Sequence, residues 1–117
     1  MGRMACRIVG VGLLAVGLAG FALPTVLGLH LTTVHNVIHL ITGLIALYAG
    51  FATRTTARFF CLFFGGGYLL LGLAGLVAPG LVSEVLGHAP VSSRELTPDN
   101  AVHAVLGAAL LAASKKP

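Results

Sequence analysis

The sequence predicts an all-α integral membrane protein, a four-helix bundle made of two helical hairpins that repeat in the same orientation. Three observations lead to this fold class. Of the 117 residues, 57% are hydrophobic and only 9% are charged, whereas soluble domains carry about 25% charged residues. No Asp, Glu, Lys or Arg occurs between Arg7 and Arg54 or between Arg58 and Glu84. Two pairs of segments also resemble each other. We therefore treat residues 1–117 as a single transmembrane domain.

The uncharged stretches are long enough for helices of about 20 residues, the length that crosses a bilayer. The first apolar run ends at Pro24 and the third at Pro79, because proline is not tolerated in a helix interior. The second begins near Thr33, a residue type that caps helix N-termini. We expect spans at about residues 8–23, 33–51, 59–78 and 98–114.

The fourth span is expected to begin in the stretch TPDN. Thr97 can cap the helix, Pro98 suits its first position, and Asp99 suits the positive end of the helix dipole. Because this span is short, we expect it to cross with little tilt or to thin the bilayer locally.

Basic residues predict the orientation of the spans. If the chain crosses the membrane four times, every segment that carries Lys or Arg lies on the same side, except the loop that contains Arg94. The positive-inside rule makes the side with most of the basic residues cytoplasmic. Those residues are Arg3, Arg7, Arg54, Arg58, Lys115 and Lys116, and the acidic residues on the other side are Glu84, Glu95 and Asp99. We expect a multi-pass inner-membrane protein with both termini in the cytoplasm. One alternative stays open, in which the first segment is a signal peptide cleaved after small residues near Gly20 and Ala22.

The chain also repeats itself. LLAVGLAGFALP (13–24) aligns with YLLLGLAGLVAP (68–79), and TVHNVIHLITGLIAL (33–47) aligns with TPDNAVHAVLGAALL (97–111). The repeat units cover about 7–51 and 58–114. Two spans return the chain to its starting side, so both units enter the membrane in the same sense. They form a parallel repeat, related by a pseudo-twofold axis along the membrane normal.

One polar motif recurs within this repeat. Asn36, His39 and Gly43 lie at helical positions i, i+3 and i+7, which share one face. The fourth span repeats them as Asn100, His103 and Gly107. Polar side chains in a membrane normally face the protein interior and pair. Our main interpretation is a structural polar pair in which Asn36, His39, Asn100 and His103 hydrogen-bond across the helices, with no cofactor.

Two cofactor hypotheses remain beside the structural one. In the first, His39 and His103 are the axial ligands of a haem b, and Gly43 and Gly107 make room for the macrocycle one turn away. In the second, a divalent metal ion binds imidazoles and a carboxylate, ligands that suit zinc or copper. Its ligands would be His35, His39, His103 and Asp99.

Other function classes leave no signature. The seven basic residues are scattered, whereas nucleic-acid binding requires a basic face. Neither a nucleophile elbow nor a phosphate-binding loop occurs, and we expect the protein not to be an enzyme. Cys6 and Cys61 belong to no paired motif and are expected to be free thiols on the reducing side. The expected role is a structural or accessory membrane subunit, in a homo-oligomer or beside a larger complex.

Three segments carry a resemblance to a known family. HNVIHLITGLIAL, RFFCLFFGGGYLLLGLAGL and TPDNAVHAVLGAALL resemble small four-span bacterial membrane proteins catalogued as domain of unknown function 4383. The likeness covers about Arg7 to Leu111. It implies four helices and a bacterial inner membrane, of the actinobacterial type. It implies no activity, so no functional residue is transferred from it.

Overall fold

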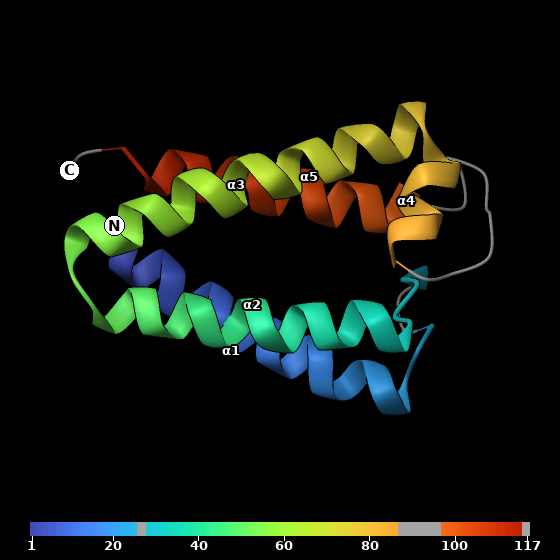
Figure 1. Ribbon diagram of the computed structural model, residues 1–117, viewed down its shortest axis with the longest axis horizontal. Helices are drawn as coiled ribbons and strands as arrows, with labels where there is room; N and C mark the ends of the chain where they lie inside the picture. The colour runs from blue at the N-terminus through green and yellow to red at the C-terminus, as the bar shows by residue number, and fades with distance from the viewer. Residues whose placement is uncertain (26–27, 87–96, 116–117) are drawn as a thin grey trace.

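The described part of the chain is mostly helical. A computed structural model describes residues 1–25, 28–86 and 97–115, and within these ranges it contains helices and no strand (Figure 1). The all-α prediction is therefore confirmed. The helices are α1 (Gly2–Ala22), α2 (Thr33–Phe51), α3 (Arg54–Val77), α4 (Pro79–Leu86) and α5 (Thr97–Ala113).

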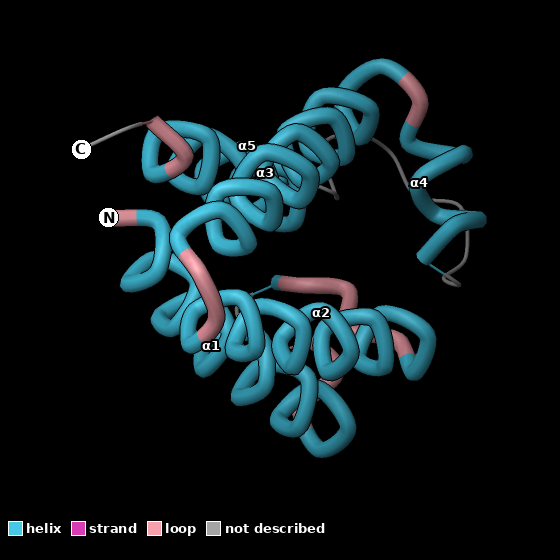
Figure 2. Tube along the Cα trace, turned by 60° about the vertical axis from the view of Figure 1, so that its left-hand side comes forward, coloured by secondary structure: helices cyan, strands magenta, loops and turns pink. Residues whose placement is uncertain are grey.

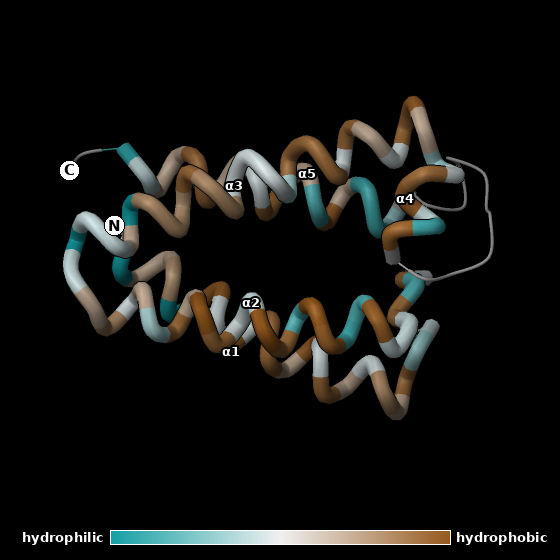
Figure 3. Tube along the Cα trace, in the orientation of Figure 1, coloured by the Kyte–Doolittle hydropathy of each residue, from teal (hydrophilic) through white to brown (hydrophobic). Residues whose placement is uncertain are grey.

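Three of these helices, α1, α2 and α3, are long and apolar enough to cross a membrane. Their large apolar side chains point outward: Ile8, Phe63 and Leu70 are 67%, 74% and 68% exposed. The polar side chains of Asn36 and His103 are buried instead. Figure 3 shows the apolar residues running along the long helices, with hydrophilic residues at helix ends and along part of α2 and α5. This distribution is the reverse of that in a water-soluble protein, and it identifies a membrane protein.

Local hydrogen bonds place the helix ends differently from the sequence prediction at three points. Thr32, not Thr33, caps α2, since its side chain accepts a hydrogen bond from the His35 N–H. The Thr53 hydroxyl accepts from the Thr56 N–H, so that α3 begins at Arg54, five residues earlier than the expected span. Pro79, expected only to end a helix, opens α4, where its fixed φ suits the first turn.

The long helices pack as two antiparallel pairs. We call α1 and α2 the first hairpin, and α3 and α5 the second hairpin (Figures 1 and 2). Glycines allow the close approach in both. A Cβ atom on Gly10 would lie 3.0 Å from the Gly43 carbonyl oxygen, and one on Gly65 would lie 3.1 Å from the Gly107 carbonyl oxygen. Small residues at such crossings let helices in lipid gain dispersion contacts.

A second set of contacts recurs in the two hairpins. Gly17 lies against the Asn36 carbonyl oxygen in the first hairpin, and Gly72 lies against the Asn100 carbonyl oxygen in the second. The Asn36 side chain packs on Gly20, just as the Asn100 side chain packs on Gly75. Residues aligned in the sequence therefore make equivalent contacts within the two hairpins.

The hairpins meet along α1 and α3, which run in the same direction (Figure 1), and also between α2 and α3 and between α1 and α5. The buried thiols of Cys6 and Cys61 lie at this contact, with their Sγ atoms 3.7 Å apart. Each thiol also faces a carbonyl oxygen of the opposite helix, Cys6 that of Ala57 at 3.6 Å and Cys61 that of Gly2 at 3.9 Å. The start of α1 and the end of α5 lie at the same end of the molecule as this contact, and α4 lies at the other end.

Candidate functional site

Three buried histidines from the two hairpins form what we call the histidine cluster: His35, His39 and His103. Their exposed fractions are 3%, 6% and 3%. The ring centroid of His35 lies 4.2 Å from that of His39 and 5.5 Å from that of His103. Each residue offers one ring nitrogen, and the three nitrogens lie within 4.8 Å of one another. The structure thus brings together three of the four residues that the sequence suggested for a metal ion.

Helix geometry explains why these side chains converge. His35 and His39 are one turn apart on α2, so their side chains leave the same face of that helix. His103, the residue aligned with His39, projects from α5 of the second hairpin. The Tyr68 ring of α3 stacks beside His103, with ring centroids 5.8 Å apart. Sequence reasoning did not single out Tyr68 as part of the site.

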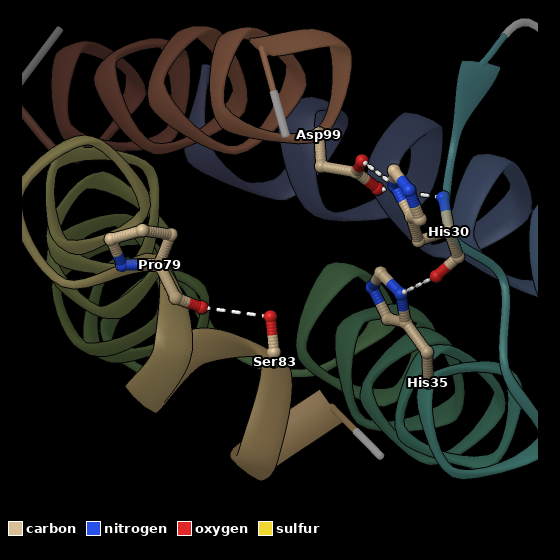
Figure 4. Close-up of polar contacts among 5 residues, drawn as sticks. All are labelled: His30, His35, Pro79, Ser83 and Asp99. Carbon is tan, nitrogen blue, oxygen red and sulfur yellow. Dashed lines mark hydrogen bonds and ion pairs between the residues drawn. The ribbon is translucent and has the colours of Figure 1, made fainter. Parts of the chain in front are cut away.

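The fourth suggested ligand, Asp99, is engaged by a different histidine. Its carboxylate, 2% exposed, accepts a hydrogen bond of 2.6 Å from His30 Nδ1–H and one of 3.0 Å from the His30 backbone N–H. Figure 4 shows His30 between Asp99 and His35. Sequence reasoning did not single out His30 as part of the site either.

His30 also orients one member of the cluster. Its carbonyl oxygen accepts a hydrogen bond of 2.9 Å from His35 Nδ1–H (Figure 4). In a neutral imidazole that donates from Nδ1, the lone pair is on Nε2. Histidines that bind metals usually donate their other ring N–H to a carbonyl or a carboxylate, which fixes the tautomer and ring orientation. The hydrogen bond from His35 to the His30 carbonyl oxygen has this form, and Asp99 in turn holds His30 in place.

Several buried polar atoms near the cluster have no hydrogen-bond partner among the described residues. They include Nδ1 of His39 and Nδ1 of His103, together with Asn36 Oδ1 and Asn100 Nδ2. The Asn36 amide makes one long bond, 3.4 Å from Nδ2 to the Leu31 carbonyl oxygen. A buried polar group left unpaired costs about 1–3 kcal/mol. The self-satisfying polar network expected from the sequence thus remains a prediction.

The cluster borders a cavity of about 310 Å³ between the hairpins. Its wall includes all three cluster histidines, Asp99 and Tyr68, and the rest is mostly apolar side chains of α1 and α5. Gly43 and Gly107 are not among the lining residues. They lie against Leu14 and Leu69, in the crossings within their own hairpins. The space beside these glycines is therefore occupied by the neighbouring helix of the same hairpin.

Comparison with known protein families gives a match. The sequence matches the family described as Domain of unknown function (DUF4383) over residues 3–116. The chain belongs to this family. The resemblance seen in three short segments is therefore confirmed over nearly the whole chain. The description of the DUF4383 family names no activity, and no curated protein and no solved structure matches the chain. The chemistry of this DUF4383 protein has to be inferred from its own geometry.

Proposed function

We propose that this protein is a non-enzymatic integral membrane protein whose two hairpins jointly hold one divalent transition-metal ion on His35, His39 and His103. The observation that carries the proposal is the convergence of three buried ring nitrogens within 4.8 Å, from two separate hairpins. The unpartnered Nδ1 atoms of His39 and His103 support it, since a metal ion would compensate their burial. The ion acts as a structural link, in keeping with a structural or accessory membrane subunit.

The chemistry of the ligands favours zinc, copper(II) or nickel. Imidazole suits all three ions, whereas magnesium and calcium require oxygen ligands. Nitrogen ligands of a tetrahedral zinc ion lie about 3.3–3.4 Å apart, so the widest pair would need to approach by about 1.5 Å through side-chain rotation. The nearby Asp99 carboxylate adds negative charge at the wall of the same cavity, which offsets part of the ionic charge.

A metal ion suits this geometry better than a haem. Bis-histidine ligation requires two imidazoles on opposite faces of a macrocycle. Here the His35 ring lies within 5.5 Å of both other rings, where the macrocycle would have to pass. Three converging imidazoles instead supply three of the four ligands of a tetrahedral zinc ion.

The topology that we propose has four spans, with α5 as the fourth and both termini in the cytoplasm of a bacterial cell. At 17 residues, α5 is about 25 Å long, close to the hydrocarbon thickness of about 30 Å. The equivalent glycine and asparagine contacts in the two hairpins support a parallel duplication. Arg3, Arg54 and Lys115 lie at one end of the molecule, as the positive-inside rule requires for a cytoplasmic end. The histidine cluster then lies towards the outer face.

A reporter fused after Pro117 tests this topology. We expect an enzyme reporter that is active only in the cytoplasm to be active there, and one that is active only in the periplasm to be silent. The opposite pattern contradicts a four-span arrangement that retains the first segment.

Metal binding is tested on the full chain purified in a mild detergent and dialysed against zinc, copper(II) or nickel. We expect one ion per chain by elemental analysis for at least one of these metals. His39→Ala and His103→Ala should each weaken metal binding by at least about tenfold. Mutation of a residue that only hydrogen-bonds to a metal ligand already weakens metal affinity by about that factor. His88→Ala, which leaves the three cluster residues in place, is the matched control.

Two outcomes contradict the metal proposal. One is a protein that takes up none of the three ions. The other is uptake that is the same in wild type, His39→Ala and His103→Ala. A Soret absorbance band lost in those two variants supports the haem hypothesis in its place.

A further inference from the structure

A second cavity lies at the opposite end of the molecule from the histidine cluster, where α1 and α3 begin and α5 ends. We call it the basic pocket. Its volume is about 540 Å³, within the range of about 300–1,000 Å³ that is usual for small-molecule sites. It is lined by Met1, Gly2, Arg3, Arg54, Thr55, Arg58, Ala113, Ser114 and Lys115.

The charge of the basic pocket has one sign. Four of its side chains are cationic, and they come from three separate segments of the chain: Arg3, Arg54 with Arg58, and Lys115. No lining residue is acidic. Like charges gathered around one cavity repel one another. The folding of the chain gathers these charges, so an anion in the pocket would relieve their repulsion.

The positive-inside rule alone explains basic residues at this end but not their convergence on one cavity. Arg7, which lies at the same end, shows the contrast. Its Nε–H donates to the Gly50 carbonyl oxygen at 2.9 Å, and its guanidinium lies 4.4 Å from the centroid of the Phe51 ring. Arg7 thus serves the end of α2, where a cation is favourable, and is not a lining residue of the basic pocket.

The donors in the pocket match a phosphate group. Arg54 and Arg58 are one turn apart on α3 and exposed, so that both guanidinium groups can reach the same anion. Guanidinium groups bind phosphate oxygens through pairs of parallel hydrogen bonds. Arg3 is half-buried, and its Nε–H donates a long hydrogen bond of 3.4 Å to the Gly50 carbonyl oxygen.

We propose that the basic pocket binds a phosphate group through Arg54 and Arg58, with Arg3 and Lys115 as further charges. This site is independent of the metal proposal. In the topology proposed above, the pocket is level with the headgroups of the cytoplasmic leaflet, where basic pockets between transmembrane helices bind anionic lipids. The phosphate group belongs either to such a lipid or to a phosphate-bearing solute of the cytoplasm.

The test uses the full chain purified in a neutral detergent. Native mass spectrometry measures how much phosphatidylglycerol the protein retains relative to phosphatidylcholine, and calorimetry measures the binding of inorganic phosphate. Arg54→Gln and Arg58→Gln should each weaken the binding of the retained anion by about tenfold or more, because each removes hydrogen bonds to a charged group. Arg7→Gln removes the same charge from the same end and should leave this binding unchanged. Thermal unfolding of each variant verifies that it is folded.

The two sources of the phosphate group give different results. Retained phosphatidylglycerol that excess inorganic phosphate does not displace identifies a lipid headgroup. Binding of inorganic phosphate, or displacement of the lipid by it, identifies a soluble phosphate. The proposal is overturned if the wild type neither prefers phosphatidylglycerol nor binds phosphate. It is equally overturned if folded Arg54→Gln and Arg58→Gln proteins bind as the wild type does.

Discussion

The glycines of this chain differ in how closely another helix approaches them. A Cβ atom on Gly72 would lie 2.7 Å from the Ala104 backbone nitrogen and 2.8 Å from the Asn100 carbonyl oxygen. Both are backbone atoms of α5, which cannot move aside without shifting the helix. Gly66, on the same helix as Gly72, has nothing within 4 Å of such an atom. Both residues are glycines within α3, but only Gly72 lies at a close contact with another helix.

This contrast predicts opposite effects of one substitution. Gly72→Ala should lower the free energy of unfolding by about 1–3 kcal/mol, because the added methyl group forces α3 and α5 apart. Gly66→Ala should raise it by up to about 1 kcal/mol, because alanine favours a helix and meets no neighbour. Thermal or denaturant unfolding in detergent, followed by circular dichroism, measures both. Equal midpoints for the two variants would contradict the packing described for the second hairpin.

The candidate site was predictable only in part. The repeat drew attention to His39 and His103, because the chain writes the same Asn, His and Gly pattern twice. His35 could be added from its position one turn before His39. The partner of Asp99 could not be found in this way, since His30 lies 69 residues away in the sequence and has no counterpart in the repeat. Such a contact depends on how the two hairpins are placed against each other.

At the scale of elements, the uncharged runs locate the long helices because a spanning helix must exclude charges over its whole length. Their ends are less predictable. A side-chain cap at Thr53 extends α3 back to Arg54, and this short-range bond outweighs the polarity of the residues that it brings into the helix. The extension has a consequence for function, since it places Arg54 and Arg58 one turn apart on one helix, where both line the basic pocket.

At the scale of the whole molecule, Cys6 and Cys61 lie where the two hairpins meet. They are aligned by the same offset that aligns Gly17 with Gly72, and each thiol faces a carbonyl oxygen of the opposite helix. This reciprocal contact is the one that the proposed parallel duplication predicts for two aligned residues. The free thiols expected from the sequence are present, but their pairing across the hairpins is a feature of the tertiary structure.

The thiol pair therefore provides a test of how the hairpins are arranged. A disulfide requires the two sulfur atoms, now 3.7 Å apart, to approach to about 2.05 Å. We expect a small membrane-permeant oxidant such as iodine to join Cys6 and Cys61 within one chain. Mass spectrometry of the unreduced protein should show the loss of two hydrogens and a peptide that links α1 to α3. Because both thiols are fully buried, the reaction should be slow unless the helices separate briefly.

Cys6→Ser provides the control, since it leaves no partner for Cys61 within the chain. Disulfides found only between chains would mean that the two hairpins do not meet along α1 and α3.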